Sequence, residues 1–197
     1  MELYYTATSP YSRKVRLLIQ EKGLQERVTE VVQNPLKNEQ TILSANPLGK
    51  IPVLILDEGH ALYDSRVICQ YLNGLTQAPD LIQSENGEVW PVLRGEALAD
   101  GIMDATFLSV MELKRSESER SAFWLERWRR QIKSALDEVE KQIPQHGGDP
   151  TLATLAFASA LVYLDLRLAD LDWRQDRPLV TAWYDDFSTR PSMKATA

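Results

Sequence analysis

The order of the secondary-structure patterns constrains the fold of this chain most. Its first part alternates apolar runs with segments of helical periodicity, and a turn containing Gly59 joins two of the apolar runs into a hairpin. The predicted elements are strands at 2–5, 28–32, 51–56 and 61–63 and helices at 10–22, 37–44 and 65–72. Residues 1–75 are therefore predicted to form an α/β domain of order β-α-β-α-β-β-α.

The remainder of the chain has helical periodicity alone. Gly74, Pro79 and several polar residues break the pattern, so residues 76–86 are interpreted as a linker. Helices are predicted at 87–115, 119–143, 152–171 and 179–188. The third of these is apolar nearly all round, which is typical of the buried helix at the centre of a bundle. Residues 87–197 are therefore predicted to form an all-helical domain.

Composition excludes several classes of function. No window of the 197 residues approaches the roughly 18 to 20 apolar residues that a membrane span needs. The net charge of −6 argues against a nucleic-acid-binding protein. The basic cluster Arg127-Trp128-Arg129-Arg130 is interpreted as the solvated side of a helix. The N-terminus lacks the pattern of a secretory signal, so we expect a cytoplasmic protein without membrane or nucleic-acid partners.

Cysteine and histidine are too scarce for several kinds of site. The single cysteine, Cys69, excludes an intramolecular disulfide, and His60 and His146 lie far apart in the sequence. We therefore expect no metal site. Cys69 lies among apolar residues of a predicted helix, and we expect it to be a small buried side chain rather than a nucleophile.

The segment Ser9-Pro10-Tyr11-Ser12 begins the first predicted helix. A serine followed by proline is a common helix start, in which the serine caps the helix and the proline occupies its first turn. The unpaired N–H groups and the positive end of the helix dipole also favour an anion at this point. The sequence alone leaves both interpretations of Ser9 open.

Four motifs in sequence order resemble those of the cytosolic glutathione transferases, in particular the bacterial serine-type members. The resemblance covers the whole chain. The motifs are Ser9-Pro10-Tyr11-Ser12 with Lys14-Val15-Arg16, Asn46-Pro47-Leu48-Gly49-Lys50-Ile51-Pro52, Asp64-Ser65 with Ile68 and Tyr71-Leu72, and Arg190-Pro191-Ser192. The resemblance implies a thioredoxin-like N-terminal domain with a mixed four-stranded sheet, followed by an all-α domain.

In thioredoxin-like proteins the first helix often begins with Cys-x-x-Cys. Here that position reads Ser-x-x-Ser, so the first helix cannot form the mixed disulfide of thiol–disulfide exchange. The resemblance instead implies that Ser9 donates a hydrogen bond to the sulfur of bound glutathione and stabilises the thiolate. Ser12 and Thr8 remain alternatives for this contact.

The resemblance also implies which residues bind the rest of glutathione. Ile51 would pair through its backbone with the cysteinyl part, next to a cis peptide at Pro52. Lys50 would bind the glycyl carboxylate, with Lys37 as a looser candidate. Two other groups complete the implied glutathione-binding set: Asp64 and Ser65 at the γ-glutamyl end, and Tyr11 in the first helix.

The second domain contributes one candidate. Asp100 and Asp104 lie four residues apart on a predicted helix, where two carboxylates repel each other unless a cation is near. In several members of the family the residue matching Asp104 reaches the ligand of the other subunit. A solvated helix face is the alternative interpretation.

The implied function is that of a homodimeric glutathione transferase. It would add the glutathione thiolate to a small hydrophobic electrophile, with glutathione as co-substrate and no cofactor. Glutathione-dependent peroxide reduction uses the same thiolate and is not separable on this sequence. The alternative from another class is a non-catalytic regulator that binds glutathione or a protein partner on the same fold.

One site departs from the family pattern. Before the central helix the family usually has Ser/Thr-x-x-Asp, whereas this chain has Thr151-Leu152-Ala153-Thr154. The reciprocal acid of the capping box is missing, so we expect a loss of about 1 kcal/mol of stability unless Asp149-Pro150 supplies another cap.

Overall fold

The computed structural model describes residues 1–84, 86–146 and 149–197, and these form two compact units. The first unit contains Met1–Ile82 together with Arg190–Ala197, and the second contains Gln83–Thr189. The prediction of one helical domain over 87–197 is therefore corrected at its end, because the last eight residues pack on the first unit. Glu85, which belongs to the predicted linker, lies outside the described residues.

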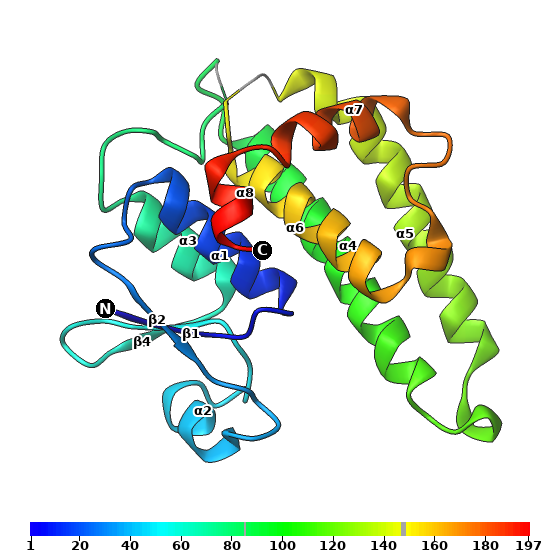
Figure 1. The fold of residues 1–197 in the computed structure, drawn as a ribbon, viewed down its shortest axis with the longest axis horizontal. Coiled ribbons are helices and arrows are strands. Elements are labelled where there is room, and N and C mark those ends of the chain that lie inside the picture. Colours follow the sequence, from blue (N-terminus) through cyan, green and yellow to red (C-terminus); the bar gives the residue numbers. More distant parts are fainter. Residues whose placement is uncertain (85, 147–148) are drawn as a thin grey trace. The chain divides into compact units, whose positions relative to one another are not determined.

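The first unit is built on a mixed four-stranded sheet (Figure 1). Its strands lie in the order β2-β1-β3-β4, with β1 parallel to β2 and antiparallel to β3, and β3 antiparallel to β4. The strands are β1 (Glu2–Tyr5), β2 (Thr29–Val32), β3 (Val53–Ile55) and β4 (Ala61–Leu62). This confirms the predicted element order and the thioredoxin-like sheet.

Helices cover both faces of this sheet. Helices α1 and α3 pack together on one face, and α2 lies on the other (Figure 1). The core beneath α1 and α3 includes Val15, Leu18, Ile68 and Cys69, all fully buried, which confirms the predicted burial of Cys69. The helices of the unit are α1 (Pro10–Glu21), α2 (Glu39–Ala45), α3 (Ser65–Asn73) and the short α8 (Pro191–Ala195).

The second unit is all-helical, as predicted. Helix α6 is buried from Leu152 to Leu161 and packs against α4, which also packs against α5. The helices are α4 (Trp90–Leu113), α5 (Ala122–Gln142), α6 (Leu152–Arg167) and α7 (Pro178–Phe187), with 3-10 turns η1 (Glu117–Glu119), η2 (Ile143–Gln145) and η3 (Ala169–Leu171). Their apolar faces account for the helical bundle.

A close approach of two helices explains the glycine at position 95. A Cβ atom added to Gly95 of α4 would lie 2.7 Å from the Cβ of Ala153 in the first turn of α6. The side chains of His146 and Phe157 border the same point. The two helices can therefore meet here only because residue 95 has no side chain.

The N-terminus of α6 corrects one expectation. A capping box is present, although the family's acid is missing: the Thr151 N–H donates to Thr154 Oγ1 at 2.8 Å, and the Thr154 N–H donates to Thr151 Oγ1 at 3.3 Å. The hydroxyl of Thr154 therefore replaces the carboxylate as the reciprocal acceptor. The expected loss of the cap does not apply.

The predicted linker is partly built into the first unit. Lys22, at the end of α1, donates from Nζ to the carbonyl oxygens of Thr76 at 3.0 Å and Pro79 at 2.5 Å. Burial lowers the pKa of Lys22, and the charge of Asp80 opposes that shift. Leu81 is fully buried. The chain therefore stays packed on the first unit until about the point where the two units divide.

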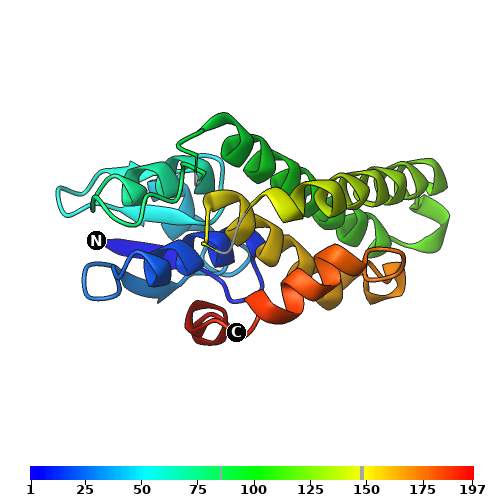
Figure 2. The ribbon, with the colours of Figure 1, turned by 90° about the horizontal axis from the view of Figure 1, so that it is seen from above.

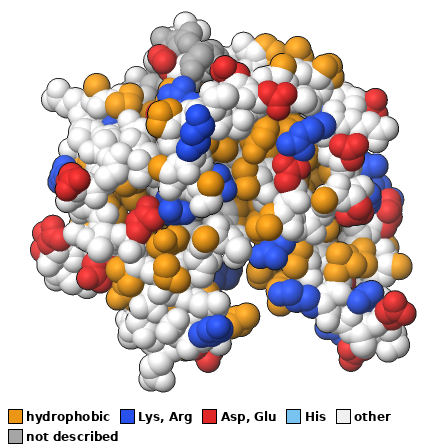
Figure 3. All heavy atoms as spheres, viewed as in Figure 1, with side chains coloured by type: hydrophobic (Ala, Val, Ile, Leu, Met, Phe, Trp, Pro, Cys, Tyr) orange, Lys and Arg blue, Asp and Glu red, His pale blue; other side chains and the backbone are white. Residues whose placement is uncertain are grey.

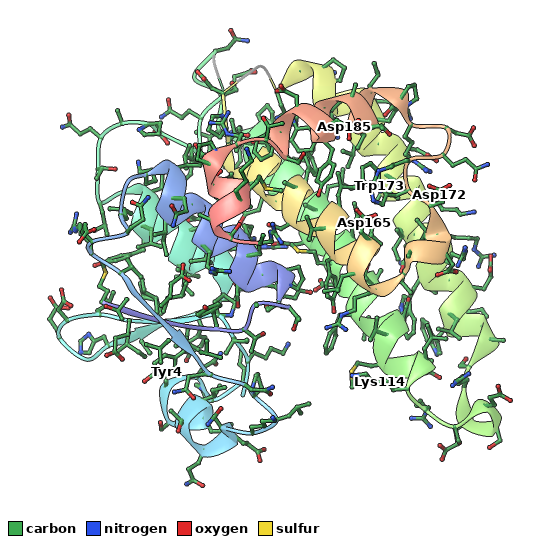
Figure 4. All side chains as sticks on the ribbon, viewed as in Figure 1. Tyr4, Lys114, Asp165, Asp172, Trp173 and Asp185 are labelled. Atoms are coloured by element: carbon green, nitrogen blue, oxygen red, sulfur yellow. The ribbon has the colours of Figure 1, made fainter. Side chains whose placement is uncertain are left out.

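Charged side chains cover the turn that connects α4 to α5. Lys114, labelled in Figure 4, marks this turn, where Lys and Arg side chains lie beside Asp and Glu side chains (Figure 3). Arg115 Nε lies 3.9 Å from Glu112 Oε1, and Arg120 Nη1 lies 4.0 Å from Glu117 Oε1. Such mixed charge is typical of a solvated surface.

The described residues bear on two classes of function that the composition disfavours. No helix among them is long and apolar enough to cross a membrane. Within the same described ranges, no three His, Cys, Asp or Glu side chains are grouped as ligands for a metal ion.

Candidate functional site

The strand register brings three of the sequence motifs to one edge of the sheet. Strand β1 ends at Tyr5, and its antiparallel neighbour β3 begins at Val53, which pairs with Tyr4. Strand β4 runs antiparallel to β3, so its end at Leu62 lies at the same edge. The loop to α1 follows β1, Pro52 precedes β3, and α3 follows β4. The candidate site therefore contains the N-termini of two helices and the loop between them.

Ser9 caps α1 at this edge. Its hydroxyl oxygen accepts a hydrogen bond from the Ser12 N–H at 3.2 Å, with Pro10 as the first residue of the helix. This bond uses a lone pair and leaves the hydroxyl proton available. Among the described residues no acceptor for that proton is found. Ser9 can therefore cap the helix and donate a hydrogen bond at the same time.

The two alternatives to Ser9 occupy different environments. Ser12 is 0% exposed, and its Oγ is buried without a hydrogen-bond partner among the described residues. Thr8 is exposed in the loop before the helix. Ser9, at the helix terminus and half-buried, combines access from solvent with the unpaired N–H groups of the first turn.

The loop before β3 is held by a residue whose role was not predicted from the sequence. Buried Asn46 donates from Nδ2 to the Lys50 carbonyl at 2.8 Å and accepts the Leu48 N–H at 3.0 Å. Gly49 has φ +64 in the turn between them, a conformation that favours glycine. Asparagine at the start of a turn, three residues before a glycine, is the sequence signal for this arrangement. The exposed Lys50 side chain is thus carried on an ordered backbone.

The peptide between Ile51 and Pro52 is cis, as the resemblance implies. Ile51 lies just outside the β1–β3 ladder, which begins at Val53. Among the described residues its backbone N–H and C=O make no hydrogen bond. They therefore remain available to an extended peptide that lies along this edge.

The N-terminus of α3 has the capping that the sequence predicts. Asp64 is the N-cap, and its Oδ1 accepts the Arg66 N–H at 3.0 Å. Ser65 is the first residue of the helix and is 3% exposed, whereas the Asp64 side chain is exposed. The peptide between Tyr63 and Asp64 is also cis. A carboxylate in front of α3 would meet its open N–H groups and the Ser65 hydroxyl.

The remaining candidates differ in their positions: one lies at the same edge of the sheet and the others lie outside it. Tyr11 is half-buried in the first turn of α1, and Lys37 is exposed before α2. Asp104 belongs to the second unit, where it is exposed on α4, whereas Asp100 is buried. Asp104 borders a surface groove of about 380 Å³ between α4 and α5. The two carboxylates therefore do not form a uniformly solvated face.

Two family models of known proteins match this chain. Residues 8–75 match the glutathione S-transferase N-terminal domain, and residues 122–186 match the glutathione S-transferase C-terminal domain. The chain belongs to the glutathione transferase family. Among its relatives is the uncharacterized GST-like protein YibF of Escherichia coli K12, 35% identical over 100% of this chain and 98% of that protein.

Solved structures of bacterial glutathione transferases resemble this member of the family over nearly its whole length. A family member from Pseudomonas fluorescens Pf-5 with bound glutathione has a TM-score of 0.94 and 42% identity, covering 99% of this chain and 97% of that one. A glutathione S-transferase from Methylobacterium radiotolerans in complex with glutathione sulfonate has a TM-score of 0.91 and 36% identity, covering 99% and 93%.

Proposed function

We propose that this protein is a serine-type glutathione transferase that activates the thiol of glutathione at the N-terminus of α1 and adds it to a small hydrophobic electrophile. The observation that carries the proposal is the hydrogen bonding of the Ser9 hydroxyl. Its oxygen caps the helix, and its proton has no acceptor among the described residues. A thiolate in front of the helix would supply that acceptor.

The energetic requirement is modest. A thiol with an ordinary pKa of about 8.5 is mostly protonated near neutral pH, and lowering that pKa by about two units corresponds to roughly 2.7 kcal/mol. One hydrogen bond to a charged acceptor contributes about 1.5 to 3 kcal/mol, and the helix terminus adds to it. Ser9 does not act as a base, because a hydroxyl stays protonated at this pH; it stabilises the charged product of ionisation.

The other residues at the edge of the sheet have complementary proposed roles toward glutathione. The Ile51 backbone pairs with the cysteinyl peptide, and Lys50 binds the glycyl carboxylate. Ser65 and the N-terminus of α3 bind the γ-glutamyl carboxylate, and Asp64 binds its ammonium group. Tyr11 contributes from the first turn of α1. The glutathione bound in the Pseudomonas fluorescens relative supports this use of the fold.

The proposed assembly is a cytoplasmic homodimer. In it Asp104 extends toward the glutathione of the partner subunit, and glutathione serves as co-substrate without a cofactor. The exposure of Asp104 on α4, beside a groove lined partly by Leu108 and Trp128, supports a contact with another chain. Sedimentation of the purified protein tests the proposed dimer, and a monomeric sedimentation profile would contradict it.

The decisive experiment compares wild type with Ser9→Ala, Ser12→Ala and Thr8→Ala. Calorimetry measures glutathione binding, and ultraviolet difference absorbance against pH measures the pKa of the bound thiol. We expect wild type to bind glutathione with a thiol pKa near or below neutral, and Ser9→Ala to bind it with a pKa at least about one unit higher. The other two variants should shift this pKa by less.

Two results would contradict the proposal in different ways. If Ser12→Ala or Thr8→Ala causes the large shift, transfer chemistry stands and the assignment to Ser9 is wrong. If wild type binds glutathione without lowering its thiol pKa, or does not bind it, Ser9 is only a helix cap. A non-catalytic binding protein on the same fold is then the better account.

A further inference from the structure

The C-terminal segment Arg190–Ala197 returns to the first unit and packs beside α1 (Figure 2). Its residues Ser192, Met193 and Thr196 are buried. The helix that carries Ser9 at its start is therefore covered by the last residues of the chain. No role for this segment beyond packing follows from the function proposed above.

The first set of contacts holds the end of α1. Arg190 donates from Nε and Nη2 to the two carboxylate oxygens of Glu21, at 2.9 and 3.0 Å, and Ser192 donates its hydroxyl to Glu21 Oε1 at 2.5 Å. Burial by itself raises the pKa of Glu21, but the hydrogen bonds from Arg190 and Ser192 and the charge of Arg190 hold it below its usual value. This is a paired, half-buried carboxylate with fixed geometry.

The second set of contacts reaches the first half of α1. Arg13 donates from Nη2 to the Met193 carbonyl at 3.2 Å, and Arg16 donates from Nη1 to the Thr196 carbonyl at 3.3 Å. The segment thus binds α1 through side chains in the first two turns as well as at its end. A rigid helix held at both ends has little freedom to tilt or slide.

Arg16 connects these contacts to the loop that precedes Ser9. Its Nε donates to Glu30 in β2 at 2.7 Å, and its guanidinium lies 4.6 Å from the ring centroid of Tyr5. Tyr5 is the last residue of β1, and the Ser9 N–H donates to the Thr6 carbonyl at 3.1 Å just after it. One end of this loop therefore follows Tyr5, which the Arg16 guanidinium contacts. The other end begins α1, the helix that carries Arg16.

We propose that the segment Arg190–Ala197 positions the Ser9 hydroxyl by fixing α1 through Glu21 and Arg16. Both are positioning residues, because they act through the helix and not on the ligand. The inference rests on the proposed function for its effect on the thiol. A hydrogen bond to sulfur depends on direction and distance, so a small displacement of α1 reduces thiolate stabilisation while the rest of the glutathione contacts remain.

The test uses the full chain with Glu21→Gln and Arg190→Gln, each of which removes one partner of the ion pair. The matched control is Asp165→Asn. The Asp165 carboxylate, labelled in Figure 4, accepts two hydrogen bonds from Arg174 in the second unit, at 2.8 and 3.0 Å. Four quantities are measured: the pKa of the bound thiol, kcat, KM for glutathione, and the rate of amide exchange in residues 11–13.

We expect both test variants to raise the bound-thiol pKa by at least about half a unit. Their kcat should fall about threefold or more, with KM for glutathione within about twofold. The amides of residues 11–13 should exchange faster. The Asp165→Asn control should change none of these; its amide oxygen can still accept the hydrogen bond from Trp173 Nε1.

The outcomes separate this inference from the proposed function. If wild type lowers the thiol pKa and the test variants leave it and the amide exchange unchanged, the segment only packs and the inference is overturned. If wild type does not lower the thiol pKa, the proposed function fails. The amide-exchange rates of residues 11–13 in the two test variants then test the inference by themselves, and rates equal to those of wild type again overturn it.

Discussion

The N-termini of α1 and α6 use the same capping chemistry with opposite results. At α6, Thr151 and Thr154 exchange hydrogen bonds, and the two residues are 5% and 1% exposed. At α1, Ser9 accepts one N–H, and no acceptor for its own proton is found among the described residues. We call the reciprocal cap of α6 closed and the cap of α1 open. A closed cap stabilises a helix, whereas an open cap at the edge of a sheet leaves hydrogen-bond donors for a ligand.

Replacing the two caps gives the sharpest test of this difference. We expect Ser9→Ala to lower kcat/KM for glutathione conjugation about 100-fold, because thiolate stabilisation is lost, and to lower the free energy of unfolding by about 1 kcal/mol. Thr151→Ala should lower the free energy of unfolding by about 1 kcal/mol or more and leave kcat/KM within about twofold. Steady-state kinetics and urea unfolding measure the pair. Equal losses of activity in both variants would show that the two caps do not differ in function.

The closed cap can be opened at Thr154. Thr154→Val keeps the shape of the side chain but leaves the buried Thr151 N–H without its acceptor, so we expect the free energy of unfolding to fall by about 1 to 3 kcal/mol. Thr154→Ser retains the hydroxyl and is the control, with a smaller loss. Urea unfolding checks both. A Val variant as stable as wild type would mean that another group or water satisfies the Thr151 N–H.

The tight packing over the start of α6 can be tested through the glycines of α4. Gly95→Ala places a Cβ against Ala153, and we expect it to lower the free energy of unfolding by about 1 to 2 kcal/mol despite the better helix propensity of alanine. In the same helix an added Cβ at Gly101 meets nothing within 4 Å. Gly101→Ala should therefore raise the free energy of unfolding by up to about 1 kcal/mol. Thermal or urea unfolding distinguishes them, and a stabilised Gly95→Ala variant would contradict the close approach.

The smallest expected effect concerns pH. Burial, assisted by the charge of Arg94, lowers the pKa of His146, which packs edge-to-face against Phe157 of α6. The unfolded chain therefore takes up a proton at a higher pH than the folded protein, and the free energy of unfolding falls as the pH drops through about 6.5 toward the lowered value. One histidine contributes at most about 1.4 kcal/mol per pH unit in this range.

Urea unfolding between about pH 8 and pH 5 measures this slope, which is set by the difference in bound protons. His146→Gln should flatten it, and His60→Gln, at an exposed position, should leave it unchanged. The same slope in wild type and His146→Gln would assign the pH dependence to other groups.

Local patterns in the sequence were enough to predict much of the fold. The four strands and helices α1, α2 and α3 of the first unit, the Asp64 cap and the buried α6 follow from periodicity and capping signals within a few residues. The cis peptide at Pro52 followed from the family resemblance. These features are set largely by residues close together in the sequence, and so a single sequence displays them.

Other features depend on partners that the sequence does not mark. The ion pair between Glu21 and Arg190 joins residues 169 positions apart, so the return of the last segment to the first unit was missed. The role of Asn46 and the reciprocal hydroxyl of Thr154 were also missed, because the family patterns draw attention to other residues. Tertiary geometry selected the partner of Glu21, whereas Asn46 and Thr154 bond to residues within four positions, so their local signals were overlooked.

The sequence by itself determined that the first helix offers hydroxyls where related folds offer thiols, which removes thiol–disulfide exchange at that position. It also determined that Ser9 and Asp64 begin helices. Only the tertiary structure decided that both helix starts and the cis peptide at Pro52 share one edge of the sheet, and that no acceptor for the Ser9 hydroxyl proton lies among the described residues. The physical reason is that capping depends on neighbouring residues, whereas burial and the satisfaction of the remaining donors depend on strands and helices that meet only in the folded chain.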